Sequence, residues 1–303
     1  MEPSEIDRKD WSQLDQNDRW EIYLTEGFPG IAKRAPFNIR LAIKLLTSGF
    51  RILPAAHRCR WCYAPFQGFG APLMHAIGRG PSGFNHNLCL DCENRMRRNL
   101  GGAEVTVTML FADIRGSTDI AEDIGPTEYS RLIDKFYVEA TDVLMRSDGF
   151  VDRLVGDEVV AYFVSGLGGE FHARRAVEAA LGILAATGHG DAGGPWVPVG
   201  IGVQTGIAYI GTVGESQKVT EITVLGDVPN TASRLASSAQ AGQIVISDDV
   251  ARETNLNTTS LEMKELALKG KKEPVTAWTI ESDRLEAFSE GILFRPFTYN
   301  VDE

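Results

Sequence analysis

The sequence lacks any apolar run that approaches the roughly 18 residues required by a membrane-spanning helix. Its first ten residues, Met1 to Asp10, carry too much charge for the apolar core of a secretory signal. Both absences argue against a membrane segment and against export, so we expect a cytoplasmic protein with no membrane contact. The sequence also has no internal repeat and no low-complexity tract, which excludes a repeat architecture.

Positive charge is scarce as well. The 303 residues hold 30 Lys and Arg against 41 Asp and Glu, which gives a net charge of -11. This balance argues against a surface that binds nucleic acid over the whole protein, and we do not expect a nucleic-acid partner. Two local basic clusters, at 33–60 and 95–98, predict solvated helix faces or partner contacts, with anion binding as the alternative.

Cysteine occurs four times, as two C-x-x-C pairs: Cys59 with Cys62, and Cys89 with Cys92. Four thiolates at this spacing suit a tetrahedral ion, so structural zinc is our first interpretation. An iron–sulfur cluster is the alternative, because four thiolates suit it equally well. Four protein ligands leave no open position, which argues against catalytic zinc. We interpret the nearby histidines as surface residues rather than ligands: His57, His75 and His86.

Apolar periodicity predicts an α+β domain after these cysteines. Residues 105–111 alternate as a strand with one buried face, and GFVDRLVGDEVVAYF indicates two strands joined at Gly156 and Asp157. WVPVGIGVQTGIAYIGTVG predicts another strand pair, with a turn at Thr205 and Gly206. With the intervening helices, the order βαββαβ plus added strands is ferredoxin-like.

The same patterns divide the chain into regions. A weak helical pattern occupies the N-terminus, and a small zinc-ribbon-like module follows it. Gly101 and Gly102 mark the boundary to the α+β domain. We predict a helical segment at 1–54, the cysteine module with a linker helix at 55–100, the α+β domain at 104–280, and a C-terminal tail at 281–303.

Two aspartates stand where strands end. Asp113 closes the first predicted strand and Asp157 lies at the tip of the hairpin. If the hairpin pairs beside the first strand, both carboxylates emerge at one end of the sheet and repel each other. A bound divalent cation explains such a pair better than two independent turn residues do.

Two further groups of residues predict contacts to a phosphate and a sugar. The run Ile114, Arg115, Gly116, Ser117, Thr118 leads into a helix whose first amides favour a triphosphate. In GDVPNTASRL, Asn230 and Arg234 are four residues apart, so both lie on one face of a helix. An amide and a guanidinium one turn apart are suited to holding a ribose and a phosphate.

Five segments of the sequence resemble the class III nucleotidyl cyclases: FADIRGST, RLVGDEVVAYF, VGIGVQTGIAYIGTVG, TVLGDVPNTASRL and LALKGKKEPVTAW. They follow that family's order and spacing over residues 104–280. The resemblance implies a phosphorus–oxygen lyase that converts a nucleoside triphosphate into a 3',5'-cyclic mononucleotide and pyrophosphate. It also implies a head-to-tail homodimer with shared active sites.

The resemblance assigns roles to the residues singled out above. Asp113 and Asp157 of one subunit correspond to the ligands of two Mg²⁺ or Mn²⁺ ions, with the backbone carbonyl of Ile114 as an extra ligand. Asn230 and Arg234 of the other subunit correspond to the pair that orients the ribose and stabilises the transition state. An inactive regulatory domain that only binds nucleotide is the alternative, but such domains usually lose one of these residues.

The two positions that select the base depart from the common pattern. Adenylyl cyclases of this family usually carry Lys four residues before the second metal aspartate and guanylyl cyclases Glu, whereas this chain has Arg153. The second position is Thr223, as in many bacterial adenylyl cyclases. We expect ATP. The alternative is a pyrimidine cyclase of bacterial antiviral defence that makes cyclic UMP or cyclic CMP, because a forked guanidinium suits a smaller base. Lys269 is a further candidate for phosphate contact.

Overall fold

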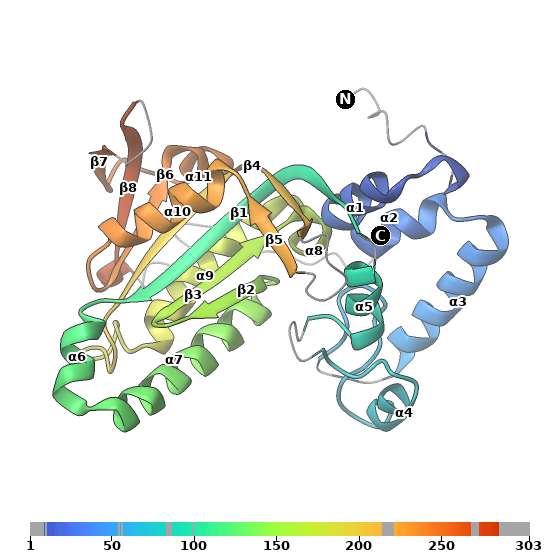
Figure 1. Cartoon of the computed structure of the whole chain (residues 1–303), viewed down its shortest axis with the longest axis horizontal. Coiled ribbons are helices and arrows are strands. Elements are labelled where there is room, and N and C mark those ends of the chain that lie inside the picture. The colour runs from blue at the N-terminus through green and yellow to red at the C-terminus, as the bar shows by residue number, and fades with distance from the viewer. Residues whose placement is uncertain are drawn as a thin grey trace.

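The computed structural model describes residues 9, 11–53, 55, 57–82, 87–98, 100–213, 221–267 and 273–284. One mixed sheet forms the centre of the described chain (Figure 1). Its order is β2-β3-β1-β4-β6-β8-β7, and β5 pairs with β4 beside that path. The strands are β1 (Gly102–Ile114), β2 (Phe150–Val155), β3 (Glu158–Phe163), β4 (Val199–Val213), β5 (Glu221–Leu225), β6 (Gln243–Ser247), β7 (Glu262–Leu266) and β8 (Val275–Glu281).

Helices cover both faces of this sheet (Figure 1). The helices α7 (Pro126–Arg146) and α9 (His172–Ala186) pack on one face, and α10 (Asp227–Ser238) packs on the other. Shorter helices complete the domain: α6 (Ser117–Ile124), α8 (Ser165–Gly168) and α11 (Asp248–Glu253). The arrangement confirms the expected α+β, ferredoxin-like domain with added strands. Of the predicted C-terminal tail, residues after 284 lie outside the described part.

The central strand β1 is buried on both of its faces. It pairs with β3 over residues 108–113 and with β4 along its whole length. Leu110 and Ala112 pack with α7 and α9, whereas Met109 and Phe111 pack on the α10 side. Our expectation of a single buried face was therefore wrong. The physical reason is that a strand between two helical layers has no face toward solvent. Successive side chains of such a strand therefore alternate between the two helical layers, and not between core and solvent.

The strand β4 runs through the turn that we predicted. Thr205 and Gly206 stay paired with β1 in the middle of this 15-residue strand, so the predicted strand pair was wrong. Close packing gives a different reason for glycine in this strand. A Cβ atom on Gly202 would lie 2.1 Å from the backbone nitrogen of Ala236, so glycine lets α10 lie directly against β4.

Three helices precede the cysteines: α1 (Gln16–Thr25), α2 (Gly27–Arg34) and α3 (Phe37–Ile52). The helix α4 (Ala71–Ala76) lies between the two cysteine pairs, and α5 (Leu90–Arg98) contains the last cysteine, Cys92. Asp15 and Asp18 form a capping box that begins α1. Trp20 and Leu24 then join a hydrophobic core that contains all four cysteines and residues of β1. The helix α1 therefore packs where β1 begins, beside the sheet (Figure 1). No helix in the described residues has both the length and the apolar character needed to cross a bilayer.

Candidate functional site

The structure brings Asp113 and Asp157 to the same end of the sheet. Asp113 is the second-last residue of β1, and Asp157 lies in the tight turn between β2 and β3. The turn forms as predicted, because Gly156 takes the left-handed conformation at φ +63°. The backbone N–H of Ile114 donates to the carbonyl of Asp157 at 3.2 Å, which fixes the hairpin beside the end of β1.

Sequence analysis missed a third carboxylate at this end. Glu158 is the direct cross-strand partner of Asp113, so both side chains stand on the same face of the sheet. Burial is the largest cause that raises the pKa of Glu158, to about 7, and the charges of Asp113 and Asp157 contribute to this rise, whereas Arg153 and Arg115 oppose it. The available signal was its position, because the residue after the turn aspartate begins β3 on the face of Asp113.

Arg115 contacts this cluster. Its guanidinium lies 2.5 Å from a carboxylate oxygen of Asp113. Burial raises the pKa of Asp113, the ion pair with Arg115 opposes that shift, and the charge of Asp157 adds to it. Three carboxylates against one bound arginine leave an excess of negative charge. Carboxylate oxygens are the ligands that Mg²⁺ and Mn²⁺ prefer, so the ligand type of these residues suits divalent cations. Among groups of three or more possible ligands within the described residues, only the four cysteines have ligand atoms that all lie within 4.8 Å of one another.

The helix α6 starts directly behind Asp113. Gly116, in the left-handed conformation at φ +66°, turns the chain, and Ser117 is the first helical residue. Among the described residues no side chain caps this helix. Its first amides, at Ser117 and Thr118, therefore have no side-chain acceptor and are suited to binding a phosphate. The arginine that we expected here, Arg115, lies on Asp113 instead.

The two residues expected to select the base lie together within one chain. The guanidinium of Arg153 on β2 donates to the hydroxyl of Thr223 on β5 at 3.1 Å. It also pairs with Asp152 at 2.7 Å, which fixes its plane. The contact joins residues 70 positions apart in the sequence. Lys269, the expected phosphate ligand, lies outside the described residues.

Asn230 and Arg234 lie on α10, away from its buried face. Val228, Ala232 and Leu235 hold this helix against the sheet, while Asn230 is exposed and Arg234 half-buried. Asn230 donates to the carbonyl of Gly226 at 3.0 Å. Within the described chain, the Arg234 side chain makes no hydrogen bond or ion pair. No such bond joins either residue to the three carboxylates there. One copy of the chain therefore does not bring the two halves of the expected site together.

The four cysteines form a buried cluster in which all four sulfur atoms lie within 4.8 Å of one another. The sulfurs of Cys62 and Cys89 are 3.6 Å apart, close to the ~3.8 Å edge of a tetrahedron with 2.3 Å zinc–sulfur bonds. Backbone N–H groups point at two sulfurs, from Cys89 to Cys59 at 3.3 Å and from Cys92 to Cys89 at 3.4 Å. Burial raises the pKa of Cys59, so a cation beside this sulfur would be needed to keep it as a thiolate. The cluster fits a tetrahedral metal centre.

Comparison with known proteins agrees with this fold. The family model of the adenylate and guanylate cyclase catalytic domain matches residues 103–282. The chain therefore belongs to this family, the class III nucleotidyl cyclases, as the sequence motifs indicated. The family is a class of phosphorus–oxygen lyases, which is the enzyme class that the sequence motifs predicted.

Individual relatives match between half and two thirds of this chain. An adenylate cyclase of Anabaena cylindrica is 31% identical over 185 residues, which cover 58% of this chain and 37% of that protein. The guanylyl cyclase Cya2 is 27% identical with a TM-score of 0.53, over 59% of this chain and 93% of Cya2. The adenylyl cyclase CyaB from P. aeruginosa is 25% identical with a TM-score of 0.52, over 60% and 97%. The chain thus spans 37% of the length of the Anabaena relative.

Proposed function

We propose that this chain is a nucleotidyl cyclase that acts as a homodimer with two shared active sites. In the reaction the ribose 3'-oxygen bonds to the α-phosphorus, the bond from that phosphorus to the β-phosphate oxygen breaks, and pyrophosphate leaves. The 3'-hydroxyl proton passes to water, so no protein base is required. The observation that carries this proposal is the convergence of Asp113, Asp157 and Glu158 at one end of the sheet.

The carboxylates of Asp113 and Asp157, with the carbonyl of Ile114, hold two Mg²⁺ or Mn²⁺ ions in this proposal. Ions bound there would lower the pKa of the ribose 3'-hydroxyl and would neutralise the negative charge of the triphosphate. Arg115 then leaves the Asp113 carboxylate and turns toward the phosphates, because a divalent ion competes for the same oxygens. The amides at the start of α6, from Gly116 to Thr118, bind the phosphates, and Lys269 assists them.

Asn230 and Arg234 act on the substrate held by the carboxylates of the second copy. The Arg234 guanidinium, which has no partner in the described chain, supplies a fixed positive charge where the five-coordinate phosphorus gains negative charge. Removing a comparable preorganised group from an active site costs about 3–4 kcal/mol of transition-state stabilisation. Asn230 orients the ribose ring. Asn230 is exposed and Arg234 is half-buried, and both lie away from the buried face of α10, which supports a site that is completed only between two copies.

The substrate in our first proposal is ATP. The Thr223 hydroxyl accepts from the adenine amino group, and Arg153 donates to a nitrogen of the adenine ring. A pyrimidine triphosphate is the second candidate. It is favoured by the length and forked shape of the Arg153 side chain, which reaches Thr223 and suits a smaller base that leaves room for it. Solved structures with similar folds include both adenylyl and guanylyl cyclases, so the fold alone does not select the base.

The experiment that tests this function is direct. Purified chain is incubated with Mn²⁺ and each of ATP, GTP, CTP and UTP, and the products are identified by mass spectrometry. We expect one cyclic mononucleotide to dominate. If a folded dimer yields no cyclic product from any of the four, the chain is instead a nucleotide-binding regulatory domain.

The Arg153→Ala variant tests base selection. We expect kcat/KM for the preferred nucleotide to fall by about 10–100-fold, because a charged hydrogen bond in the site contributes roughly 1.5–3 kcal/mol. The value of kcat/KM for the other three nucleotides should fall less, so the ratio between the preferred nucleotide and the others becomes smaller. The matched control is Arg131→Ala, which removes an exposed arginine of α7 that pairs with Glu128. Equal losses for all four nucleotides would contradict a role for Arg153 in selecting the base.

We further propose that Cys59, Cys62, Cys89 and Cys92 hold a structural zinc ion, with an iron–sulfur cluster as the alternative. The backbone N–H groups directed at the sulfurs and the full burial of the cluster support a closed centre with no position for substrate. In this proposal the ion stabilises the N-terminal helices against the sheet.

A further inference from the structure

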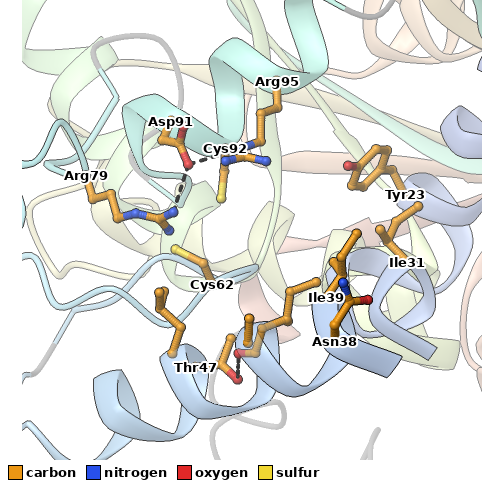
Figure 2. Close-up of a pocket in the computed structure, with 13 residues that line it drawn as sticks. Tyr23, Ile31, Asn38, Ile39, Thr47, Cys62, Arg79, Asp91, Cys92 and Arg95 are labelled. Carbon is orange, nitrogen blue, oxygen red and sulfur yellow. Dashed lines mark hydrogen bonds and ion pairs between the residues drawn. The ribbon is translucent and has the colours of Figure 1, made fainter. Parts of the chain in front are cut away.

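A cavity of about 600 Å³ lies between α3 and the cysteine cluster, outside the proposed active site. Figure 2 shows α3 along one wall and the side chains of Arg79, Asp91 and Arg95 on the facing wall. Cys62 and Cys92 also line this cavity, so it directly adjoins the metal centre. Tyr23 and Ile31 from the first two helices close one side of it.

The wall formed by α3 is apolar and has no protein partner in the described chain. Ile39, Ile43 and Leu46 recur at helical spacing, a pattern that normally packs a helix onto a core. Yet none of the 16 residues of α3 is buried, and Ile39 and Leu46 remain 41% and 45% exposed. The end of α3 is held in place, because Arg58 donates to the carbonyl of Phe50 at 2.7 Å. The middle of the helix therefore stands away from the module and leaves apolar surface open.

The facing wall carries positive charge. The guanidinium groups of Arg79 and Arg95 each lie 3.1 Å from the same oxygen of Asp91, so two cations share one carboxylate (Figure 2). The surrounding sequence reinforces this charge, because no Asp or Glu stands between Glu26 and Asp91. That stretch contains these cations: Lys33, Arg34, Arg40, Lys44, Arg51, Arg58, Arg60 and Arg79. Several of them already pair with carboxylates, as Arg34 does with Glu26 and Arg60 with Asp148, and of this set only Arg79 lines the cavity. The groups positioned to meet an anion are therefore the guanidinium groups of Arg79 and Arg95.

We propose that this cavity binds an amphipathic organic anion, with an apolar chain or ring system and one carboxylate, sulfonate or phosphate group. The apolar part lies along Ile39, Ile43 and Leu46, and the anionic group meets Arg79 and Arg95. The volume suits a molecule of this class, because ligand pockets for drug-sized molecules span roughly 300–1,000 Å³. We expect one ligand molecule to bind per chain, because the cavity lies between helices of a single chain.

The cysteine module also contacts the α7–β2 turn of the catalytic domain. Arg60, between the first two cysteines, lies 2.5 Å from a carboxylate oxygen of Asp148, which is only 1% exposed. The Asn87 side chain donates to the carbonyl of Gly149 at 3.1 Å. From that turn β2 leads directly to Arg153 and then to Asp157. A ligand beside Cys62 and Cys92 is therefore placed to shift β2 and change the rate of cyclisation, a second claim that rests on the proposed function.

The binding claim is tested with 1-anilinonaphthalene-8-sulfonate, which joins an aromatic body to a sulfonate. We expect the metal-loaded full chain to bind one molecule per chain saturably, and dodecanoate below its micelle concentration to displace it. The Ala42→Trp variant fills the cavity and should weaken binding by about tenfold or more. The control is Leu45→Trp, because Leu45 lies on the outer side of α3, is 66% exposed and does not line the cavity. Its binding should equal that of the unmodified chain.

A second variant tests the proposal without placing a large side chain in the cavity, which could disturb folding. Arg95→Gln alters a side chain that is 59% exposed, and it should weaken dodecanoate about tenfold while leaving dodecanol unchanged. Binding that is equal in Ala42→Trp and the unmodified chain would overturn the proposal. So would equal affinities for dodecanoate and dodecanol, or a dimer that binds no dye because a second copy covers α3.

Activity separates the two claims. Dodecanoate should change the rate of cyclic nucleotide formation in the unmodified chain and in Leu45→Trp, but not in Ala42→Trp. Binding without any change in rate would overturn the link through β2 and leave the binding site standing. A chain that binds dodecanoate but forms no cyclic product contradicts the proposed function, not the binding site.

Discussion

Mixing two inactive variants, Asp113→Asn and Arg234→Ala, should restore about a quarter of the unmodified activity, because half of randomly formed dimers are mixed and each carries one intact site of two. Alone, each variant should lose about 10²-fold or more, since the first removes a metal ligand and the second removes transition-state charge stabilisation. The readout is the rate of cyclic nucleotide formation at fixed total protein. This expectation rests on the proposed shared site, and it is supported by the lack of any bond between Arg234 and the carboxylates within one described chain.

Two controls make this complementation interpretable. Mixed dimers are isolated with a different affinity tag on each variant, so assembly is shown separately from activity. Asp142→Asn serves as the matched variant, because Asp142 is an exposed α7 residue that pairs only locally, with Arg146. It should keep full activity by itself. Isolated mixed dimers that stay as inactive as the parents would contradict a site shared between two copies.

Replacing Cys62 by Ser should remove the bound metal and destabilise the N-terminal module by on the order of 5 kcal/mol, since structural zinc contributes about 10–16 kcal/mol in isolated zinc-finger peptides. The loss is transmitted to the sheet, because all four cysteines share a hydrophobic core with Trp20 and Val105. Elemental analysis should give about one zinc per unmodified chain and near none in the variant. Calorimetry should show a separate unfolding transition at lower temperature.

The matched variant for this test is His57→Ala, which removes an exposed imidazole of the same module that lies 3.4 Å from Gln67. Its metal content and unfolding should equal those of the unmodified chain. If the purified protein contains iron and acid-labile sulfide, the four cysteines hold an iron–sulfur cluster and not zinc. A Cys62→Ser chain that keeps both metal and melting temperature would contradict a metal centre built from these thiolates.

Much of the candidate site follows from local signals. The glycine before Asp157 marks a turn whatever surrounds it, and the four-residue spacing of Asn230 and Arg234 puts them on one helix face. The two C-x-x-C pairs likewise indicate a metal centre, because each pair is a local knuckle. Such features depend on a few neighbouring residues, so they were visible before any fold was known.

Other features required the pairing of distant segments. Gly206 has the composition of a turn, but continuous pairing of β4 with β1 and the close approach of α10 at Gly202 keep it in a strand. Glu158 became part of the site only through its register with Asp113. The salt bridge from Arg115 to Asp113, a local contact, also escaped prediction because side-chain direction depends on the turn behind β1.

The sequence by itself determined the family, the strand-end carboxylates and the cysteine centre, since each is encoded in short ordered motifs. Only the tertiary structure decided that Arg153 meets Thr223, that β1 is buried on both faces, and that α3 leaves an apolar wall opposite Arg79 and Arg95. The reason is that these contacts join residues far apart in the chain. Their energies depend on burial and on the charges that packing brings together, which local sequence patterns do not record.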